Sequence, residues 1–324
     1  MPSVNYDNSH STLEPVFSKP VPTPARDPHA LACFREAGRV ISKARAVGVS
    51  LIKPGVTIRE VTERVEAEIR RLGGIPAFPA QSSRNSIAAH YCSHPTDATM
   101  YQVGDVVKLD IGAAVDGYVC DTAVSIDLGD GERGKTLVAA AKAALDSAIA
   151  TAGPGVSVSK IGEAIGRTIK SFGVNPVANL TGHGVGRWKV HTAPQIPNVA
   201  ERGSGSLLEV GTVCAIEPFA TDGLGYVEER GRAEVFMANN KKPKITKDVD
   251  PDVLDAILKW NGLPIARRYF SEFDTQRVEN TLFGLIKQGC LVKYPPLCED
   301  PGTMVAQFEH TLLITNDGVE VLTM

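Results

Sequence analysis

A repeat with a period of one hundred residues is the feature that most restricts what this chain can fold into. Residues 54–73 and 154–173 share six identical positions, including the opening Pro-Gly-Val and the closing glycine. Both copies keep apolar residues three and four positions apart, so each predicts an amphipathic helix behind a Pro-Gly-Val loop. The shared register favours a domain of two similar halves with a ligand held between them. Two unrelated helices behind a common loop motif are the alternative.

Further elements can be placed around this repeat. Asp27-Pro28 is typical of a helix start, with an N-cap followed by proline at the first helical position. Thr57 and Glu60 form a capping box that opens the first repeated helix. Strands are predicted on both sides of an Asp-Gly turn at 105–111 and 118–128, and later at 212–219 and 307–315. Helices mixed with short antiparallel strands indicate the α+β class.

The sequence pattern divides the chain into three parts. Residues 1–27 are polar and rich in proline, so we expect an irregular N-terminal arm. Residues 28–233 and 304–324 are expected to form the main domain. Residues 234–303 contain two helical patterns and are expected to form an inserted helical subdomain. Their basic run at 241–247 is expected to be a solvated loop, with a contact surface as the alternative.

Composition excludes several classes of protein. The 324 residues are 43% hydrophobic and 22% charged, which excludes a disordered, collagen-like or coiled-coil chain. The net charge of −3 provides no basic field for nucleic acid or an anionic membrane. The sequence contains no apolar run of about 18 residues, so no membrane span is predicted. The N-terminus does not resemble a secretory signal. The six cysteines form no C-x-x-C and suggest reduced thiols of a cytoplasmic protein, with a Cys290–Cys298 disulfide as the alternative.

Two acidic residues lie inside apolar strands. Asp110 is in the middle of one, and Asp121 follows eleven residues later in the next, so the turn between them brings the carboxylates together. Two buried carboxylates repel each other and require a positive partner. Lys108 has the same strand parity as Asp110 and is one candidate. A divalent metal ion is the other, because such ions prefer carboxylate oxygens.

Three further potential ligands lie in similar settings. His183 is in a glycine-rich loop, and Glu217 and Glu309 are in apolar segments. Four carboxylates and one imidazole suit a pair of divalent ions bridged by a carboxylate and a water. Each residue alone has an ordinary alternative, such as a hydrogen-bonded strand carboxylate or a solvated histidine. His90 and His191 are either acid–base or supporting groups of such a site, or satisfied interior histidines.

The motifs around these residues resemble the ligand motifs of the pita-bread metallopeptidases. In the family's order they are Lys-Leu-Asp110-Ile-Gly, Cys-Asp121-Thr, Thr-Gly-His183-Gly-Val, Ile-Glu217-Pro-Phe and Gln-Phe-Glu309-His-Thr. Ala-Phe78-Pro and Ile-Ala-Ala-His90-Tyr resemble the methionine aminopeptidases in particular, and the resemblance covers about residues 30–324. The separation of 92 positions between Glu217 and Glu309, together with the short N-terminal arm, resembles the archaeal form of the type II enzymes.

This resemblance implies a pita-bread fold with an internal pseudo-two-fold repeat and an inserted helical subdomain. It also implies that two divalent metal ions, of cobalt, manganese, iron or zinc, are bound by Asp110, Asp121, His183, Glu217 and Glu309. In the family pattern Asp121 and Glu309 would bridge both ions, and His183 and Glu217 would complete one site.

The same resemblance implies roles in catalysis and substrate binding. Glu217 would shuttle a proton, His90 and His191 would contact the substrate and stabilise the tetrahedral intermediate, and Phe78 would line the methionine pocket. The sequence departs from the family after His90, where Tyr-Cys-Ser-His-Pro replaces Tyr-Thr-Pro. Cys92 and His94 therefore lie near the expected rim of the site without an assigned role.

The implied activity is that of a cytoplasmic methionyl aminopeptidase, which removes the N-terminal methionine of nascent proteins and peptides and prefers a small second residue. A peptidase of the same fold that cleaves Xaa-Pro bonds is one alternative. A non-enzymatic relative that binds ribosomes, nucleic acid or other proteins is another, although all five ligand residues are kept. A monomer is the default, neither a membrane nor direct nucleic-acid binding is expected, and transient ribosome contact is left open.

Overall fold

The structure, a computed structural model, describes residues 27–201, 205–239 and 241–324. Its largest element is a nine-stranded sheet with the strand order β1-β4-β5-β17-β9-β7-β8, in which β2 also pairs with β4 and β18 with β17. All of these pairs are antiparallel. Helices and antiparallel strands are mixed along the chain, as the predicted α+β class requires.

The helices are α1 (Pro28–Leu51), α2 (Ile58–Arg71), α3 (Glu132–Thr151), α4 (Val158–Ser171), α5 (Pro251–Leu258), α6 (Thr275–Lys287) and the 3-10 helix η1 (Arg267–Phe270). The strands are β1 (Ile75–Pro76), β2 (Gln81–Arg84), β3 (Ile87–Ala89), β4 (Val106–Val115), β5 (Tyr118–Asp127), β6 (Asn175–Pro176), β7 (Thr181–Gly186), β8 (Lys189–Pro197), β9 (Val213–Ile216), β10 (Phe219–Thr221), β11 (Glu228–Glu229), β12 (Val235–Ala238), β13 (Ile265–Ala266), β14 (Leu291–Tyr294), β15 (Leu297–Cys298), β16 (Val305–Gln307), β17 (Glu309–Ile314) and β18 (Val319–Val321).

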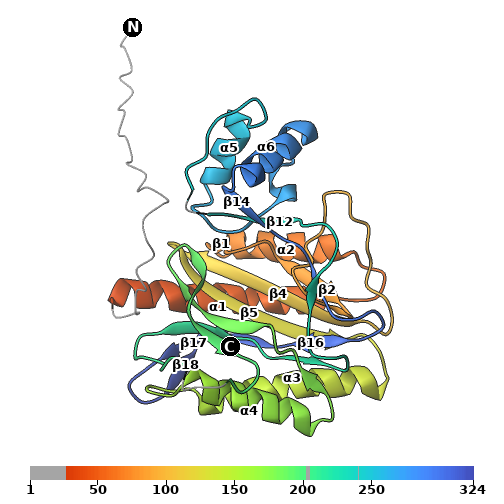
Figure 1. Ribbon diagram of the computed structural model, residues 1–324, viewed down its shortest axis with the longest axis vertical. Helices are drawn as coiled ribbons and strands as arrows, with labels where there is room; N and C mark the ends of the chain where they lie inside the picture. The colour runs from red at the N-terminus through yellow and green to blue at the C-terminus, as the bar shows by residue number, and fades with distance from the viewer. Residues whose placement is uncertain (1–26, 202–204, 240) are drawn as a thin grey trace.

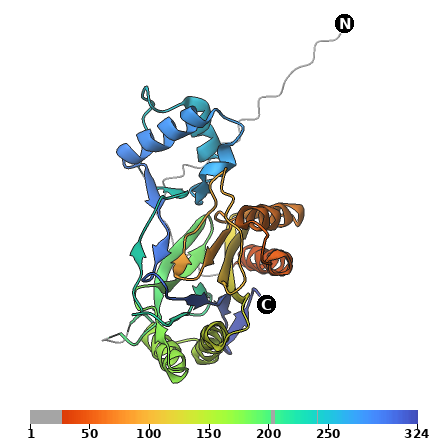
Figure 2. The ribbon, with the colours of Figure 1, turned by 90° about the vertical axis from the view of Figure 1, so that its right-hand side faces the viewer.

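The two copies of the hundred-residue repeat form α2 and α4, and each of these helices pairs with the helix before it. The pair α1 and α2 covers β4 and β5, and the pair α3 and α4 covers the other half of the sheet (Figures 1 and 2). Helices α2 and α4 begin one hundred residues apart, and the side chains of Thr57 and Ser157 cap them. Each helix buries its predicted apolar stripe, and each buried aliphatic side chain contributes about 1.5–3 kcal/mol to folding. The prediction of two similar halves is confirmed.

The turn between β4 and β5 fixes the register of the central strands. Asp116 and Gly117 have φ values of 48° and 81°, as a type I′ turn requires. A Cβ at Gly117 would lie 2.4 Å from the Trp188 ring, so packing also requires glycine here. The strand predicted at 212–219 is instead divided into β9 and β10, with Pro218, which has no N–H to donate, between them.

Residues 234–303 contain a sheet as well as the predicted helices. The three-stranded sheet β13-β12-β14 packs with α5 and α6 around a separate core that includes Val253, Phe270 and Leu282. This segment lies at the top of Figure 1. Its strands have two to four residues, which is too short to give a periodic signal in the sequence. The bounds of the three parts of the chain stay a prediction.

A buried ion pair joins this segment to α2. Arg268 in η1 donates hydrogen bonds of 2.8 and 2.6 Å to Glu66, and the Tyr269 hydroxyl donates a third of 2.7 Å. Glu66 is only 2% exposed and also accepts a 2.9 Å hydrogen bond from the backbone N–H of Ala80. One carboxylate therefore connects α2, the inserted segment and the residues that lead into β2.

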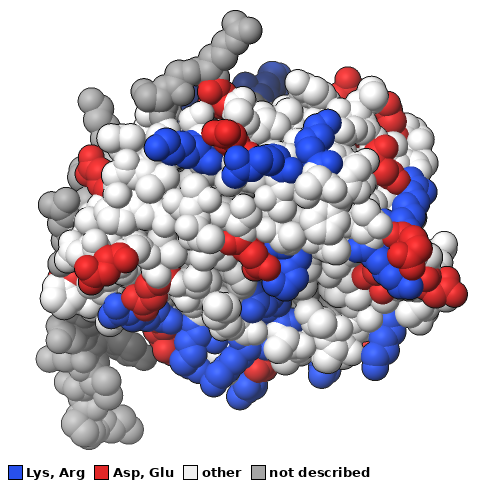
Figure 3. All heavy atoms as spheres, turned by 90° about the horizontal axis from the view of Figure 1, so that it is seen from below, with Lys and Arg blue, Asp and Glu red and all other residues white. Residues whose placement is uncertain are grey.

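Several expectations from composition can be compared with the structure. All six cysteines are free thiols, so the Cys290–Cys298 disulfide is not formed. None of the described helices combines the length and apolarity needed to cross a bilayer. On the face that carries α3 and α4, basic and acidic side chains lie together (Figure 3), as with Lys142 and Asp146 at 2.9 Å. The predicted N-terminal arm lies outside the described residues except for Asp27, which caps α1.

Candidate metal centre

Five neighbouring strands of the large sheet carry the five predicted metal ligands. In the strand order β4-β5-β17-β9-β7, these residues are Asp110, Asp121, Glu309, Glu217 and His183, with Glu217 directly after the end of β9. The sheet thus brings together residues that lie far apart in the sequence.

Strand register places the first three of these side chains on one face. Asp110 pairs with Ala123, and Asp121 pairs with Gly112, which is two residues from Asp110. Ala123 also pairs with Glu309 on the next strand. Because side chains two residues apart in a strand share a face, the three carboxylates point to the same side of the sheet.

The other two ligands follow from the next strand pairs. Ala215 on β9 pairs with Thr311 on β17 and with His183 on β7. Thr311 is two residues from Glu309, and Glu217 is two residues from Ala215, so all five side chains have the same orientation.

His183 lies in a strand, which corrects the prediction of a loop. Glycines surround it because neighbouring backbones approach closely here. A Cβ at Gly182 would lie 2.4 Å from the carbonyl oxygen of Ala215, and one at Gly184 would lie 2.1 Å from that of Ala193. Only glycine fits these positions, and the glycine-rich pattern misleadingly suggested a flexible loop.

The five side chains face a cavity of about 840 Å³. The other three predicted site residues, Phe78, His90 and His191, line the same cavity. The residues that separate the ligands on this face include Ala123 and Ala215, whose small side chains leave space above the sheet. All eight predicted site residues thus meet in one place.

Distances in the cavity suit a shared cation. His183 Nε2 lies 3.7 Å from Asp121 Oδ2 and 3.4 Å from Glu217 Oε1. Its Nδ1 lies 3.2 Å from the carbonyl oxygen of Gly184, which leaves Nε2 facing the carboxylates. One ligand atom each from Asp121, His183 and Glu309 lie within 4.8 Å of one another. Atoms at this spacing can converge on a metal ion at bond lengths of about 2.0–2.2 Å.

No lysine or arginine among the described residues neutralises the four carboxylates. Burial raises the pKa of Asp110 to about 7, and burial together with Asp110 raises the pKa of Asp121 well above its usual range. Burial and the neighbouring carboxylates raise the pKa values of Glu217 and Glu309 as well. Asp110 Oδ1 and Asp121 Oδ1 are buried and have no hydrogen-bond partner among the described residues. Unpaired, mutually repelling carboxylate oxygens fit divalent cations, which would supply the missing charge.

Lys108, the alternative partner, does not pair with these carboxylates. Its Nζ donates hydrogen bonds to the backbone carbonyls of Asn85, at 2.8 Å, and Val106, at 3.5 Å. Among the described residues, no lysine or arginine forms an ion pair with any of the four carboxylates, whose ionic neighbour is His183. The lysine alternative is wrong for this protein.

Two further histidines present neutral rings to the cavity. Burial lowers the pKa of His191 and lowers that of His90 to about 4. The rings of His191 and His183 are 4.3 Å apart. His90 has a φ of 64°, and its backbone N–H donates to Gln81 Oε1 at 2.8 Å. His90 Nδ1 is buried without a partner in the described part of the chain, so the interpretation of a satisfied interior histidine does not fit it.

Three residues around the site were not predicted from the sequence. Gln307 Nε2 lies 3.5 Å from Glu217 Oε2, the Tyr294 ring packs edge-on against His90 at 5.6 Å, and Gln81 holds the backbone of His90. Gln307 is two residues before Glu309. Because side chains two residues apart in an extended segment point to the same face, this spacing could have identified Gln307 as a neighbour of the site. Tyr294 comes from the inserted segment, and no local pattern places it beside His90.

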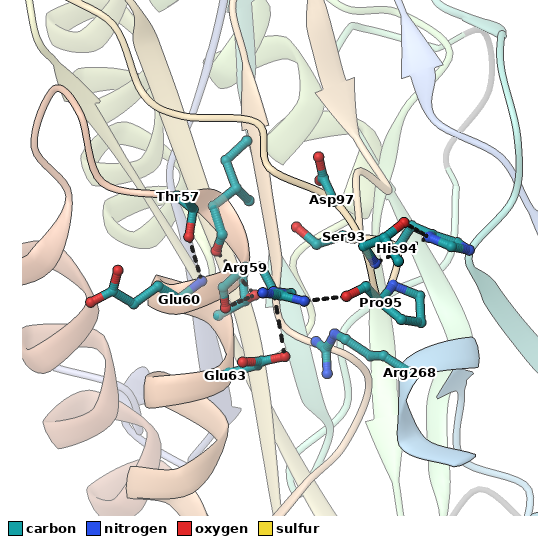
Figure 4. A network of polar contacts seen from close by, with 12 residues as sticks. Thr57, Arg59, Glu60, Glu63, Ser93, His94, Pro95, Asp97 and Arg268 are labelled. Carbon is teal, nitrogen blue, oxygen red and sulfur yellow. Dashed lines mark hydrogen bonds and ion pairs between the residues drawn. The ribbon is translucent and has the colours of Figure 1, made fainter. Parts of the chain in front are cut away.

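The residues at which the family motif changes lie outside the cavity. Neither Cys92 nor His94 is among the described residues that line it. His94 Nδ1 lies 2.9 Å from Thr96 Oγ1, within a loop that α2 holds in place (Figure 4). Arg59 on α2 donates a hydrogen bond to the carbonyl of Pro95. The changed motif therefore alters a supporting loop rather than the lining of the cavity.

Comparison with known sequences identifies relatives over most of the chain. The sequence profile of metallopeptidase family M24 matches residues 32–316. A methionine aminopeptidase of Methanocaldococcus jannaschii is 43% identical over 89% of this chain and 96% of its own length. A methionine aminopeptidase of Methanothermobacter thermautotrophicus is 40% identical over 90% of this chain and 97% of its own length.

Solved structures share the fold. The methionine aminopeptidase of Thermotoga maritima has a TM-score of 0.67 and 28% identity, over 92% of this chain and 98% of that chain. A thermophilic Arx1 has a TM-score of 0.80 at 18% identity, over 92% and 91% of the two chains. The prolidase of Pyrococcus furiosus has a TM-score of 0.62 at 19% identity, over 93% of this chain and 65% of that one. The latter two bear on the fold alone, and the predicted pita-bread fold is confirmed. Given the family match over most of its length and relatives with 40–43% identity, the chain belongs to metallopeptidase family M24 and, within it, to the methionine aminopeptidases.

Proposed function

We propose that the protein hydrolyses the peptide bond after the N-terminal methionine of nascent proteins and peptides, with a preference for a small second residue. One observation carries this proposal: four carboxylates and one imidazole on one face of the sheet open into the cavity that holds Phe78, His90 and His191. Relatives named for this activity match the chain along nearly their whole lengths. We expect the protein to act in the cytoplasm as a monomer.

The metal-binding residues in this proposal are Asp110, Asp121, His183, Glu217 and Glu309. They would hold two divalent ions of cobalt, manganese, iron or zinc. A bound pair of this kind activates water for attack and polarises the scissile carbonyl.

The other steps rest on the protein's own side chains. Glu217 lies at the cavity wall, where its carboxylate can take up a proton and return it to the leaving amine. The neutral rings of His90 and His191 can donate hydrogen bonds to a substrate amide as charge develops on its oxygen. Phe78, which is 6% exposed, supplies an apolar wall for the methionine side chain.

The first test is peptide hydrolysis by metal-stripped protein with manganese, cobalt, iron or zinc added back singly. We expect metal-dependent release of methionine from Met-Ala-Ser and no hydrolysis of Ala-Pro-Ala. Release of alanine from the proline peptide would instead favour an Xaa-Pro peptidase. Inactivity with every metal would favour a non-enzymatic relative.

A second prediction concerns the methionine pocket. A Cβ at Gly112 would lie 2.3 Å from the Phe78 ring, so Gly112→Ala must displace this wall. We expect kcat/KM for Met-Ala-Ser to fall about tenfold, mainly through KM, since a misplaced apolar contact costs about 1–3 kcal/mol. Gly131→Ala is the control, because a Cβ there meets nothing within 4 Å. Equal kinetics of the two variants would contradict the role of Phe78.

A further inference from the structure

We propose a separate site for one zinc ion, formed by His29, Cys33 and Asp116 where the start of α1 meets the turn between β4 and β5. None of these residues lines the cavity described above. The three residues supply one nitrogen, one sulfur and one oxygen ligand. This set differs from the proposed catalytic ligands, which contain no sulfur.

The ligand atoms already converge. His29 and Cys33 are one helical turn apart on α1, so their side chains share a face. His29 Nε2 lies 3.6 Å from Cys33 Sγ and 2.9 Å from Asp116 Oδ2, and the three ligand atoms lie within 4.8 Å of one another. Tetrahedral zinc with bonds of about 2.0–2.3 Å separates its ligand atoms by about 3–4 Å. Only small side-chain movements are needed to admit the ion.

Arg187 holds the Asp116 carboxylate in position. Arg187 donates a 2.9 Å hydrogen bond to Asp116 Oδ1 and a 3.0 Å hydrogen bond to the Asp116 backbone carbonyl. The guanidinium also lies over the Tyr118 ring, 5.6 Å from its centroid. Asp116 Oδ2 is thereby left facing His29. Hydrogen bonds of this kind orient carboxylates that bind metals.

Charge and donor type favour zinc. A Cys33 thiolate, an Asp116 carboxylate and a neutral His29 would together balance one divalent ion. Without an ion, burial and the Asp116 charge raise the pKa of Cys33, so zinc would displace a proton from the thiol as it binds. Sulfur and imidazole ligands suit zinc, whereas magnesium, calcium and manganese prefer oxygen. A simple His29–Asp116 ion pair would not require a thiol, yet the Cys33 sulfur is the third member of the group and is only 7% exposed.

The ion would link the start of α1 to the β4–β5 hairpin. These two strands carry Asp110 and Asp121, and α1 packs directly on both strands. We therefore expect zinc at this site to stabilise the half of the domain on which the catalytic carboxylates are built. Water would complete the tetrahedral coordination.

The test is a cobalt titration of metal-stripped protein, because only a cysteine-ligated site gives a near-ultraviolet thiolate-to-cobalt charge-transfer band. We expect one band that reaches full intensity by about three equivalents of cobalt, because the two proposed catalytic ions take up cobalt as well, and that is removed by added zinc. Cys33→Ser and His29→Ala should abolish it, and Cys298→Ser, which changes a partly exposed cysteine outside the cluster, should retain it. No band, a band only in large cobalt excess, or a band that persists in Cys33→Ser would overturn the proposal.

Thermal unfolding gives a second readout. Zinc that binds the folded state raises Tm by mass action. The wild type and Cys33→Ser share the proposed catalytic ligands, so the difference between their zinc-induced shifts reports the His29 site alone. We expect a larger shift in the wild type, while Cys33→Ser should still release methionine. Equal shifts would overturn the zinc site without affecting the proposed activity.

Discussion

Glu309→Gln is expected to lower kcat/KM for Met-Ala-Ser by about 10³–10⁴-fold, which corresponds to about 4–5.5 kcal/mol of transition-state stabilisation. Glu309 is only 1% exposed, and one of its oxygens belongs to the cluster with Asp121 and His183. Glutamine has the same shape, so packing is kept while one charged metal ligand is replaced by a weaker amide. We expect less metal to remain bound after dialysis.

This variant can be separated from one that merely unfolds. Burial and the neighbouring Asp121, Glu217 and Asp110 raise the pKa of Glu309, so its negative charge is unfavourable in the metal-free site, and removing it should raise rather than lower the Tm of the metal-free protein. Glu320→Gln is the matched control, because Glu320 on β18 is bound to Arg35 at 2.8 Å, away from the cavity. It should keep full activity. Near wild-type turnover of Glu309→Gln with normal metal content would contradict the proposed centre.

The site was predictable where its signal was local. A carboxylate among apolar strand residues is costly unless something binds it, and this argument identified Asp110 and Asp121 without reference to any structure. The two helices of the repeat were predictable because their apolar stripes and caps lie within twenty consecutive residues.

Prediction from sequence failed where the deciding contact is remote. The glycines beside His183 indicated a loop, but they exist because β8 and β9 leave no room for a Cβ. Lys108 has the parity expected of a partner for Asp110, yet its long side chain reaches the carbonyl of Asn85 on another segment. The sheet in the inserted segment and the packing of Tyr294 on His90 likewise depend on residues far apart in the chain.

The second prediction with a large expected effect concerns the ion pair of Arg268 and Glu66, two residues that are also far apart in the sequence. Arg268→Met should lower the free energy of unfolding by about 3–5 kcal/mol, because it leaves the Glu66 carboxylate buried without its charge partner. The next cation, Arg70, lies 3.9 Å from Glu66, and its side chain is 46% exposed, so it replaces little of the lost interaction. Urea unfolding followed by circular dichroism measures the change.

An exposed pair on the same helix provides the control. Arg71 lies 2.6 Å from Glu68 on α2, but its side chain is 67% exposed, so Arg71→Met should cost less than about 1 kcal/mol. Adding Glu66→Gln to Arg268→Met should restore part of the stability, since the uncompensated charge is then removed. The effect should also reach the cavity, because Glu66 holds the Ala80 backbone, and the adjacent Gln81 holds that of His90. We therefore expect Arg268→Met to raise KM for Met-Ala-Ser even at temperatures where it stays folded. An unfolding free energy equal to that of Arg71→Met would show that this ion pair does not hold the inserted segment in place.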